Sequence, residues 1–231
     1  MDYAVSPPEL HTLAIAGRSE RFPVNRIFCV GRNYAAHARE MGKDPQREAP
    51  FFFMKPASAT VDAAQPATIP YPQKTANFHH EIELVLAIGS GGADIEVANA
   101  LEHVYGYGVG LDMTRRDLQL EARDKGRPWE FGKSFAYSAP IGEIHRARDV
   151  GHPGEARITL SVNGQPRQSS DISKLIWSVS ECVAYLSQYE ALEAGDLIMT
   201  GTPEGVGAVV RGDVLCGAIA GLGEITVTVA A

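Results

Sequence analysis

The sequence has few cysteines, no long apolar run and no excess of basic residues, and each absence excludes a class of protein. Cys29, Cys182 and Cys216 are an odd, scattered set, which favours a reducing compartment over a disulfide framework. No apolar run approaches the roughly 20 residues that span a bilayer, and the N-terminus lacks the basic and apolar stretches of a signal peptide. With 21 Lys and Arg against 28 Asp and Glu, a nucleic-acid partner is not expected either. We therefore expect a cytoplasmic protein that does not bind membranes.

What the chain does contain is a large number of turn-forming residues. It has 23 glycines and 14 prolines among 231 residues, which favours short strands joined by tight turns over long helices. Its 45% of hydrophobic residues suit one globular domain with a substantial core. No linker divides the chain and no internal repeat occurs. We predict a β-rich, mixed α+β catalytic domain over residues 25–231 with peripheral helices, preceded by a lead-in hairpin over residues 1–24.

Hydrophobic periodicity places the elements. We expect strands at residues 27–30, 51–54, 81–88, 104–112, 158–162, 196–200 and 225–229, with a hairpin turn at Asn163-Gly164. We expect helices at residues 34–41 (Asn33 as N-cap, Gly42 as stop), 94–102 and 114–125, and along the apolar face from Leu175 to Leu186. Residues 57–78 lack a period and are expected to form a surface loop.

Carboxylates open one predicted strand and close another. Because side chains alternate along a strand, Glu81 and Glu83 share one face while Ile82 and Leu84 share the other. Two adjacent carboxylates either form a solvated strand start or surround a cation. Asp112, at the end of a glycine-rich strand, is either an N-cap of the next helix or a third oxygen ligand. Such ligands favour a hard ion, Mg²⁺ or Mn²⁺.

Other polar residues stand in contexts that suit catalysis. His37 and Glu40 are three apart on a predicted helix, as in a water-activating base or an ordinary surface pair. Lys133 lies among aromatic residues and Lys55 follows an apolar run, so each either reaches solvent or meets an anion. The glycine-rich segment 201–207 can bring backbone amides to a carboxylate. The sequence has no nucleophile elbow, phosphate loop or dinucleotide fingerprint, so covalent nucleophilic catalysis is not expected.

These motifs, in this order, resemble the fumarylacetoacetate hydrolase family, in particular its short acylpyruvate and fumarylpyruvate hydrolase branch. The resembling segments are residues 29–41, 53–56, 79–84, 111–114, 116–119, 125–129, 132–135 and 201–207. They extend over roughly residues 25–229. The resemblance implies a β-roll fold, a homodimer, and one Mg²⁺ or Mn²⁺ ion per subunit.

The resemblance also implies roles for individual residues. Glu81, Glu83 and Asp112 match the metal ligands, His37 and Glu40 the water-activating pair on a lid, Lys133 the active-site lysine, Arg116 and Gln119 substrate-contacting positions, and Lys55 and Thr202 contacts to a carboxylate. Longer members of the family carry an additional upstream aspartate ligand. This sequence has no equivalent, so we expect a water molecule in that position.

The implied reaction is hydrolysis of the C–C bond of an acylpyruvate by an activated water, with a metal-bound pyruvate enolate as intermediate. The best match is fumarylpyruvate, from aromatic catabolism, which gives fumarate and pyruvate. A cation should then meet the fumaryl carboxylate, and Arg32, Arg39 and Arg123 are unranked candidates. The alternatives are an oxaloacetate decarboxylase or hydroxy-dienedioate isomerase/decarboxylase with the same site, and a non-catalytic metal-binding protein. Decarboxylation needs no activated water, so the His37–Glu40 pair favours hydrolysis.

Overall fold

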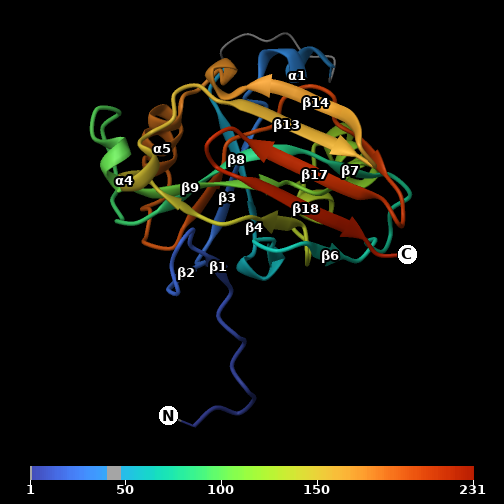
Figure 1. The fold of residues 1–231 in the computed structure, drawn as a ribbon, viewed down its shortest axis with the longest axis horizontal. Helices are drawn as coiled ribbons and strands as arrows, with labels where there is room; N and C mark the ends of the chain where they lie inside the picture. Colours follow the sequence, from blue (N-terminus) through green and yellow to red (C-terminus); the bar gives the residue numbers. More distant parts are fainter. Residues whose placement is uncertain (1, 41–47) are drawn as a thin grey trace.

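A mixed sheet of eight strands forms the centre of the computed structural model, which describes residues 2–40 and 48–231 (Figure 1). Its strands, in order across the sheet, are β4 (Phe51–Lys55), β3 (Ile27–Gly31), β15 (Leu197–Met199), β8 (Ile82–Ile88), β9 (Val104–Leu111), β11 (Ala139–Ile141) and β5 (Thr60–Asp62), with β12 (His145–Arg146) also paired to β9. The β3–β15 and β5–β11 pairs are parallel, and the other pairs are antiparallel. β8 is buried along its whole length, as its apolar sequence from Leu84 onward requires.

A second sheet packs against the first and closes the main core. It contains β14 (Gln165–Asp171), β13 (Arg157–Val162), β17 (Val214–Ile219), β18 (Glu224–Val229) and β6 (Ala67–Ile69). Leu84 of β8, Leu160 of β13 and Val227 of β18 belong to one buried apolar cluster between the sheets. The predicted hairpin turn between β13 and β14 is confirmed: Asn163 and Gly164 both have positive φ, 50° and 74°, as a tight two-residue turn needs.

The remaining elements lie around these two sheets. Two small sheets pair β1 (Thr12–Ala14) with β2 (Arg21–Pro23), and β10 (Thr114–Arg115) with β7 (Phe78–His80) and β16 (Gly207–Val209). The helices are α1 (Ala35–Glu40), α2 (Arg116–Asp124), α3 (Glu130–Lys133), α4 (Ala147–Val150) and α5 (Val179–Ser187), with 3₁₀ turns η1 (Ala57–Ala59), η2 (Ala100–His103) and η3 (Ile172–Lys174). Figure 1 shows α1, α4 and α5 outside the sheets, which confirms the β-rich fold with peripheral helices. Among the described helices, none combines the length and apolarity needed to cross a membrane.

Two predicted helices differ from the structure. The helix predicted at residues 94–102 is wrong, because this segment forms turns and only η2 is helical. The helix predicted along the apolar face from Leu175 begins instead at Val179. Ser178 caps it: the Ser178 hydroxyl accepts a hydrogen bond from the Glu181 N–H, and the Glu181 carboxylate accepts one from the Ser178 N–H. This reciprocal cap stabilises a helix start at that point.

Two predictions in the first third of the chain also need correction. Residues 57–78 are not one loop, since they contain β5 and β6, which pair at the edges of the two sheets. Asn33, predicted as the N-cap of α1, has its buried side-chain amide directed elsewhere. It donates to the carbonyl oxygens of Trp177 and Thr200 and accepts from the Trp177 N–H. The predicted helix stop at Gly42 lies outside the described residues.

Candidate metal centre and active site

The pairing of β8 with β9 brings the three predicted carboxylates together. Ile82 lies opposite Leu111 in the antiparallel register, and the next backbone hydrogen bond runs from the Asp112 N–H to the Glu81 carbonyl, at 2.9 Å. Glu83 lies on the same face as Glu81, two residues along the strand. One carboxylate oxygen from each of Glu81, Glu83 and Asp112 lies within 4.8 Å of the others, and all three side chains are buried.

Cations from α2 and α3 surround this carboxylate cluster. The Lys133 ammonium donates to Glu81 Oε2 at 2.7 Å, to Asp112 Oδ2 at 2.5 Å and to Thr114 Oγ1 at 2.7 Å. The Arg116 guanidinium pairs with the other oxygen of Glu81. Although burial alone would raise the pKa of Glu81, Lys133 and Arg116 together hold it well below its usual range. Glu81 is therefore ionised, and all three protons of Lys133 are in use.

Lys55 lies behind the carboxylate cluster and does not line the cavity above it. Its ammonium is 2.8 Å from Asp112 Oδ1, but its hydrogen bonds go to Ser138 Oγ and to the carbonyls of Met113 and Lys133. Asp112 Oδ1 is therefore a buried oxygen that accepts no hydrogen bond from any residue in the described ranges.

The carboxylate cluster fits a divalent cation. Burial, together with the neighbouring charges of Asp112 and Glu81, raises the pKa of Glu83 well above its usual range. The Gly201 N–H donates to Glu83 at 2.8 Å, which offsets only part of this cost. A cation placed against Glu83 and Asp112 Oδ1, an oxygen that has the Lys55 ion pair but accepts no hydrogen bond within the described residues, would stabilise both groups as carboxylates. Three buried oxygen donors of this kind match the ligand preference of Mg²⁺ and Mn²⁺.

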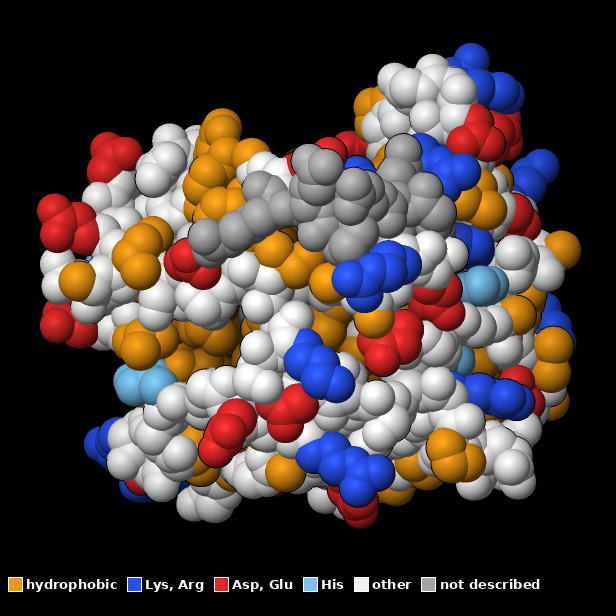
Figure 2. Space-filling view, turned by 90° about the horizontal axis from the view of Figure 1, so that it is seen from above, with side chains coloured by type: hydrophobic (Ala, Val, Ile, Leu, Met, Phe, Trp, Pro, Cys, Tyr) orange, Lys and Arg blue, Asp and Glu red, His pale blue; other side chains and the backbone are white. Residues whose placement is uncertain are grey.

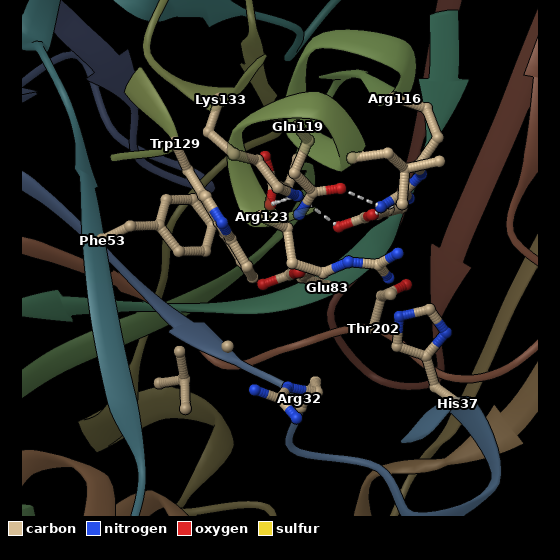
Figure 3. Close-up of a pocket in the computed structure, with 15 residues that line it drawn as sticks. Arg32, His37, Phe53, Glu83, Arg116, Gln119, Arg123, Trp129, Lys133 and Thr202 are labelled. Carbon is tan, nitrogen blue, oxygen red and sulfur yellow. Dashed lines mark hydrogen bonds and ion pairs between the residues drawn. The ribbon is translucent and has the colours of Figure 1, made fainter. Parts of the chain in front are cut away.

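A cavity with about 730 Å³ of empty space opens over the carboxylate cluster (Figure 3). The predicted residues that line it are Glu81, Glu83, Asp112, His37, Lys133, Arg116, Gln119 and Thr202. Phe53 of β4 and Trp129 before α3 form an aromatic wall that sequence reasoning did not assign to the site. These eight residues from distant parts of the chain thus meet at one cavity, together with the candidate cations Arg32 and Arg123. Glu40 and Lys55 do not line it.

His37 and Glu40 form a hydrogen-bonded pair on α1. Glu40 Oε2 lies 3.1 Å from His37 Nδ1, and only 6% of His37 is exposed. The Glu40 carboxylate also accepts the Gly205 N–H, at 3.1 and 3.2 Å from its two oxygens. With Nδ1 directed at Glu40, Nε2 is the ring nitrogen left for the cavity. Glu40 therefore orients His37 and connects α1 to the glycine-rich segment.

Arg116 and Gln119 lie one turn apart on α2 and hydrogen-bond to each other. Arg116 also contacts His79, with 3.5 Å between Arg116 Nε and His79 Nδ1. Burial and the adjacent guanidinium lower the pKa of His79 to about 4, so this ring is neutral near pH 7. The start of α2 is anchored by Asp117, which accepts the Thr75 hydroxyl at 2.5 Å and the Ala76 N–H at 2.9 Å.

One buried residue that supports the site has no recognisable signal in the sequence. Gln168, 1% exposed, lies on β14 in a polar segment without a recognisable motif. Its amide nitrogen donates to Thr202 Oγ1, and its amide oxygen accepts the Ile82 N–H. Thr202 Oγ1 in turn donates to the Ile82 carbonyl at 2.8 Å. The Thr202 hydroxyl proton is therefore already used within the protein.

Comparisons with known proteins show which sequences this chain resembles. The family model described as "Fumarylacetoacetate (FAA) hydrolase C-terminal" matches residues 26–230. A fumarylpyruvate hydrolase from Ralstonia sp is 50% identical over 186 residues, which are 80% of this chain and 95% of that protein. An oxaloacetate tautomerase from Escherichia coli (strain K12) is 40% identical over 195 residues, 84% of this chain and 88% of that protein.

A solved structure is similar over almost the whole chain. The crystal structure of fumarylpyruvate hydrolase from Pseudomonas aeruginosa in complex with Mn²⁺ and pyruvate superposes with a TM-score of 0.97. It is 58% identical in sequence and covers 99% of both chains. The same fold with Mn²⁺ bound in that protein agrees with the fit of this carboxylate cluster to a divalent cation.

Proposed function

The chain belongs to the fumarylacetoacetate hydrolase family, and from this premise we propose that it is a divalent-metal-dependent hydrolase that cleaves fumarylpyruvate into fumarate and pyruvate. The observation that carries the proposal is the meeting of a buried carboxylate cluster and a His37–Glu40 pair at one cavity. The first supplies ligands for a cation, and the second supplies a base for water. Hydrolysis of an acylpyruvate needs both.

We assign the metal to Glu81, Glu83 and Asp112. When bound there, Mg²⁺ or Mn²⁺ supplies a Lewis acid for the 2-oxo acid end of the substrate. Lys133 and Arg116 keep Glu81 ionised, and Lys55 places a positive charge beside Asp112. These three buried cations pair with Glu81 and Asp112, while no ion pair is formed by Glu83 within the described residues, so Glu83 gains most from a bound metal.

His37 is the proposed base. It takes one proton from a water molecule at Nε2 while Glu40 stabilises the imidazolium through Nδ1. The water oxygen forms a bond to the acyl carbonyl carbon, C4 of the substrate. The bond between C3 and C4 then breaks, its electron pair remains on C3, and one proton is returned to C3 to give pyruvate. The C4 side leaves as a carboxylic acid that keeps the water oxygen and the second water proton, and it becomes fumarate when it releases this proton to solvent.

Other cavity residues have positioning roles in this proposal. Lys133 offsets the negative charge that develops beside the carboxylate cluster as the electron pair moves to C3. Arg116 and Gln119 fix one wall of the cavity and restrict how the pyruvate portion lies. Thr202, with its hydroxyl proton engaged, offers the substrate carboxylate its backbone rather than its side chain. Lys55 acts through Asp112 and does not touch substrate.

The second candidate is chemistry on oxaloacetate, by decarboxylation or tautomerisation. It is favoured by the 40% identity to the oxaloacetate tautomerase from Escherichia coli (strain K12), and proton transfer by His37 suits it. We prefer hydrolysis because identity to fumarylpyruvate hydrolases is higher, 50% and 58%. The test is kcat/KM for fumarylpyruvate, acetylpyruvate and oxaloacetate at one fixed Mn²⁺ concentration. A preference for oxaloacetate would overturn the proposed reaction.

We also propose that the enzyme is a cytoplasmic homodimer. The homodimer rests on the family resemblance, and the compartment rests on three cysteines that all remain free thiols, two of them buried. Light scattering of the purified protein tests the first statement. A mass near 24.9 kDa would show a monomer and contradict it.

A further inference from the structure

The cation for the far end of the substrate is not settled by the family assignment. A fumaryl group carries a second carboxylate, and burying it in the cavity without a positive partner would be costly. Of the candidate arginines, Arg32 and Arg123 line the cavity, while Arg39 is exposed on α1 and does not. Figure 3 shows Arg32 entering from the end of β3 and Arg123 from α2.

Arg32 differs from the other cavity cations in having no anionic partner among the described residues. Lys133 and Arg116 are engaged with the carboxylate cluster. Arg123 is paired with Asp124 at 2.9 Å. Among the described residues, the contact of the Arg32 guanidinium is aromatic, with its carbon 4.9 Å from the centre of the Phe51 ring. Its positive charge is therefore available to an anionic ligand.

The backbone and the aromatic neighbours hold Arg32 in this position. Arg32 has a φ of 56°, a left-handed conformation that non-glycine residues seldom adopt. The Phe51 ring lies against Gly31, where a Cβ would come within 2.1 Å of it, and it packs against Trp129 in an edge-to-face arrangement. A guanidinium held over a ring still has N–H groups to donate to a carboxylate.

We propose that Arg32 is the specificity-determining residue that binds the distal carboxylate of the acyl group. The 2-oxo acid end lies at the carboxylate cluster, and the acyl chain runs past Phe53 and Trp129 toward Arg32. Arg123, whose charge is shared with Asp124, contributes less. This inference rests on the proposed function, since it names the feature of the acylpyruvate that the cavity selects: a second negative charge at the far end.

The test compares two acylpyruvates that differ in that charge, with Arg32→Met as the variant. Fumarylpyruvate has the distal carboxylate and acetylpyruvate lacks it. Loss of one charged hydrogen-bonding contact predicts a fall of about 10- to 100-fold in kcat/KM for fumarylpyruvate, mainly through KM. The value for acetylpyruvate should change less than about threefold. Arg39→Met is the matched control and should leave both values unchanged, and Arg32→Lys should restore part of the loss.

Equal losses on both substrates, or no loss on fumarylpyruvate, would overturn the inference while leaving the proposed function intact. If instead the proposed function fails, a binding measurement still tests the assignment of Arg32. Calorimetry of fumarate and crotonate, which lacks one carboxylate, is run on the Mn²⁺-loaded protein with pyruvate present. If the wild type cleaves neither acylpyruvate, weaker fumarate binding in Arg32→Met still supports the assignment. Equal fumarate binding in the two proteins, or none in either, contradicts it.

Discussion

The His37–Glu40 pair leads to a prediction that separates a base from its orienting group. Glu40→Gln preserves the shape of the side chain and one oxygen acceptor, but removes the charge that stabilises the imidazolium. A hydrogen bond to a charged group contributes about 1.5–3 kcal/mol. Because the Glu40 side chain is 36% exposed, we reduce this to about 1–2 kcal/mol. The expected fall in kcat is therefore about 5- to 30-fold, with KM little changed.

His37→Ala removes the base itself and should lower kcat by about 100- to 10,000-fold. The double variant should be no slower than His37→Ala alone, because Glu40 acts through His37. Steady-state hydrolysis of fumarylpyruvate at saturating Mn²⁺ measures all three, with the exposed Glu96→Gln as control. If the two effects multiply in the double variant, Glu40 has a separate role, such as its bond to Gly205, and the claim that Glu40 acts through His37 is refuted; near wild-type hydrolysis by His37→Ala would refute the base itself.

Three further predictions concern the metal, a helix anchor and the buried amide. Asp112→Asn should weaken Mn²⁺ binding, measured by calorimetry, by at least about 100-fold. Mutation of a residue that only orients a metal ligand already lowers metal affinity by about 10- to 100-fold, and loss of a ligand should cost more. Unchanged binding would refute the ligand set. The second prediction concerns Asp117 at the start of α2. Partial burial favours a higher pKa for this carboxyl group, but hydrogen bonds hold the pKa of Asp117 below its usual range. Asp117 therefore stabilises the fold above about pH 4 and loses this effect on acidification, so Asp117→Asn should lower the free energy of unfolding by about 1 kcal/mol at pH 7 and by progressively less as the pH falls below about 4. A difference that grows in acid would contradict the sign. Gln168→Leu removes the side-chain partner of the Ile82 N–H, of the Pro203 carbonyl and of His80 Nδ1, and one of the two hydrogen bonds of the Thr202 hydroxyl. It should cost about 3 kcal/mol in urea unfolding and raise KM, unlike the exposed Gln165→Leu.

Strand periodicity predicted part of the carboxylate cluster because it is local information, and the family resemblance supplied the full set of three. Glu81 and Glu83 share a face wherever the strand lies. What brought Asp112 to them was the register of β8 with β9, a long-range pairing that no local pattern encodes. The same reason explains Asn33: its position before a helix suggests a cap, but residues more than 140 positions away satisfy its amide.

Other parts of the site depend on which charged side chains already have ion-pair or hydrogen-bond partners in the folded protein, and this cannot be read from the sequence. Lys133 and Lys55 look alike in their apolar surroundings, yet only Lys133 reaches the cavity. The three candidate arginines are equivalent by residue type, and only the structure separates paired from unpaired charges.

Figure 2, which looks onto the side that carries α1, shows acidic and basic side chains interspersed over the described surface. The net charge of −7 thus says little about this face.

The central claim is metal-dependent hydrolysis of a C–C bond, and product analysis of the purified wild-type protein tests it most directly. With fumarylpyruvate and Mn²⁺, NMR should show fumarate and pyruvate appearing in a one-to-one ratio. EDTA should stop their formation, and added Mg²⁺ or Mn²⁺ should restore it. Formation of both products at an undiminished rate in EDTA, or consumption of fumarylpyruvate without release of fumarate, would contradict the account.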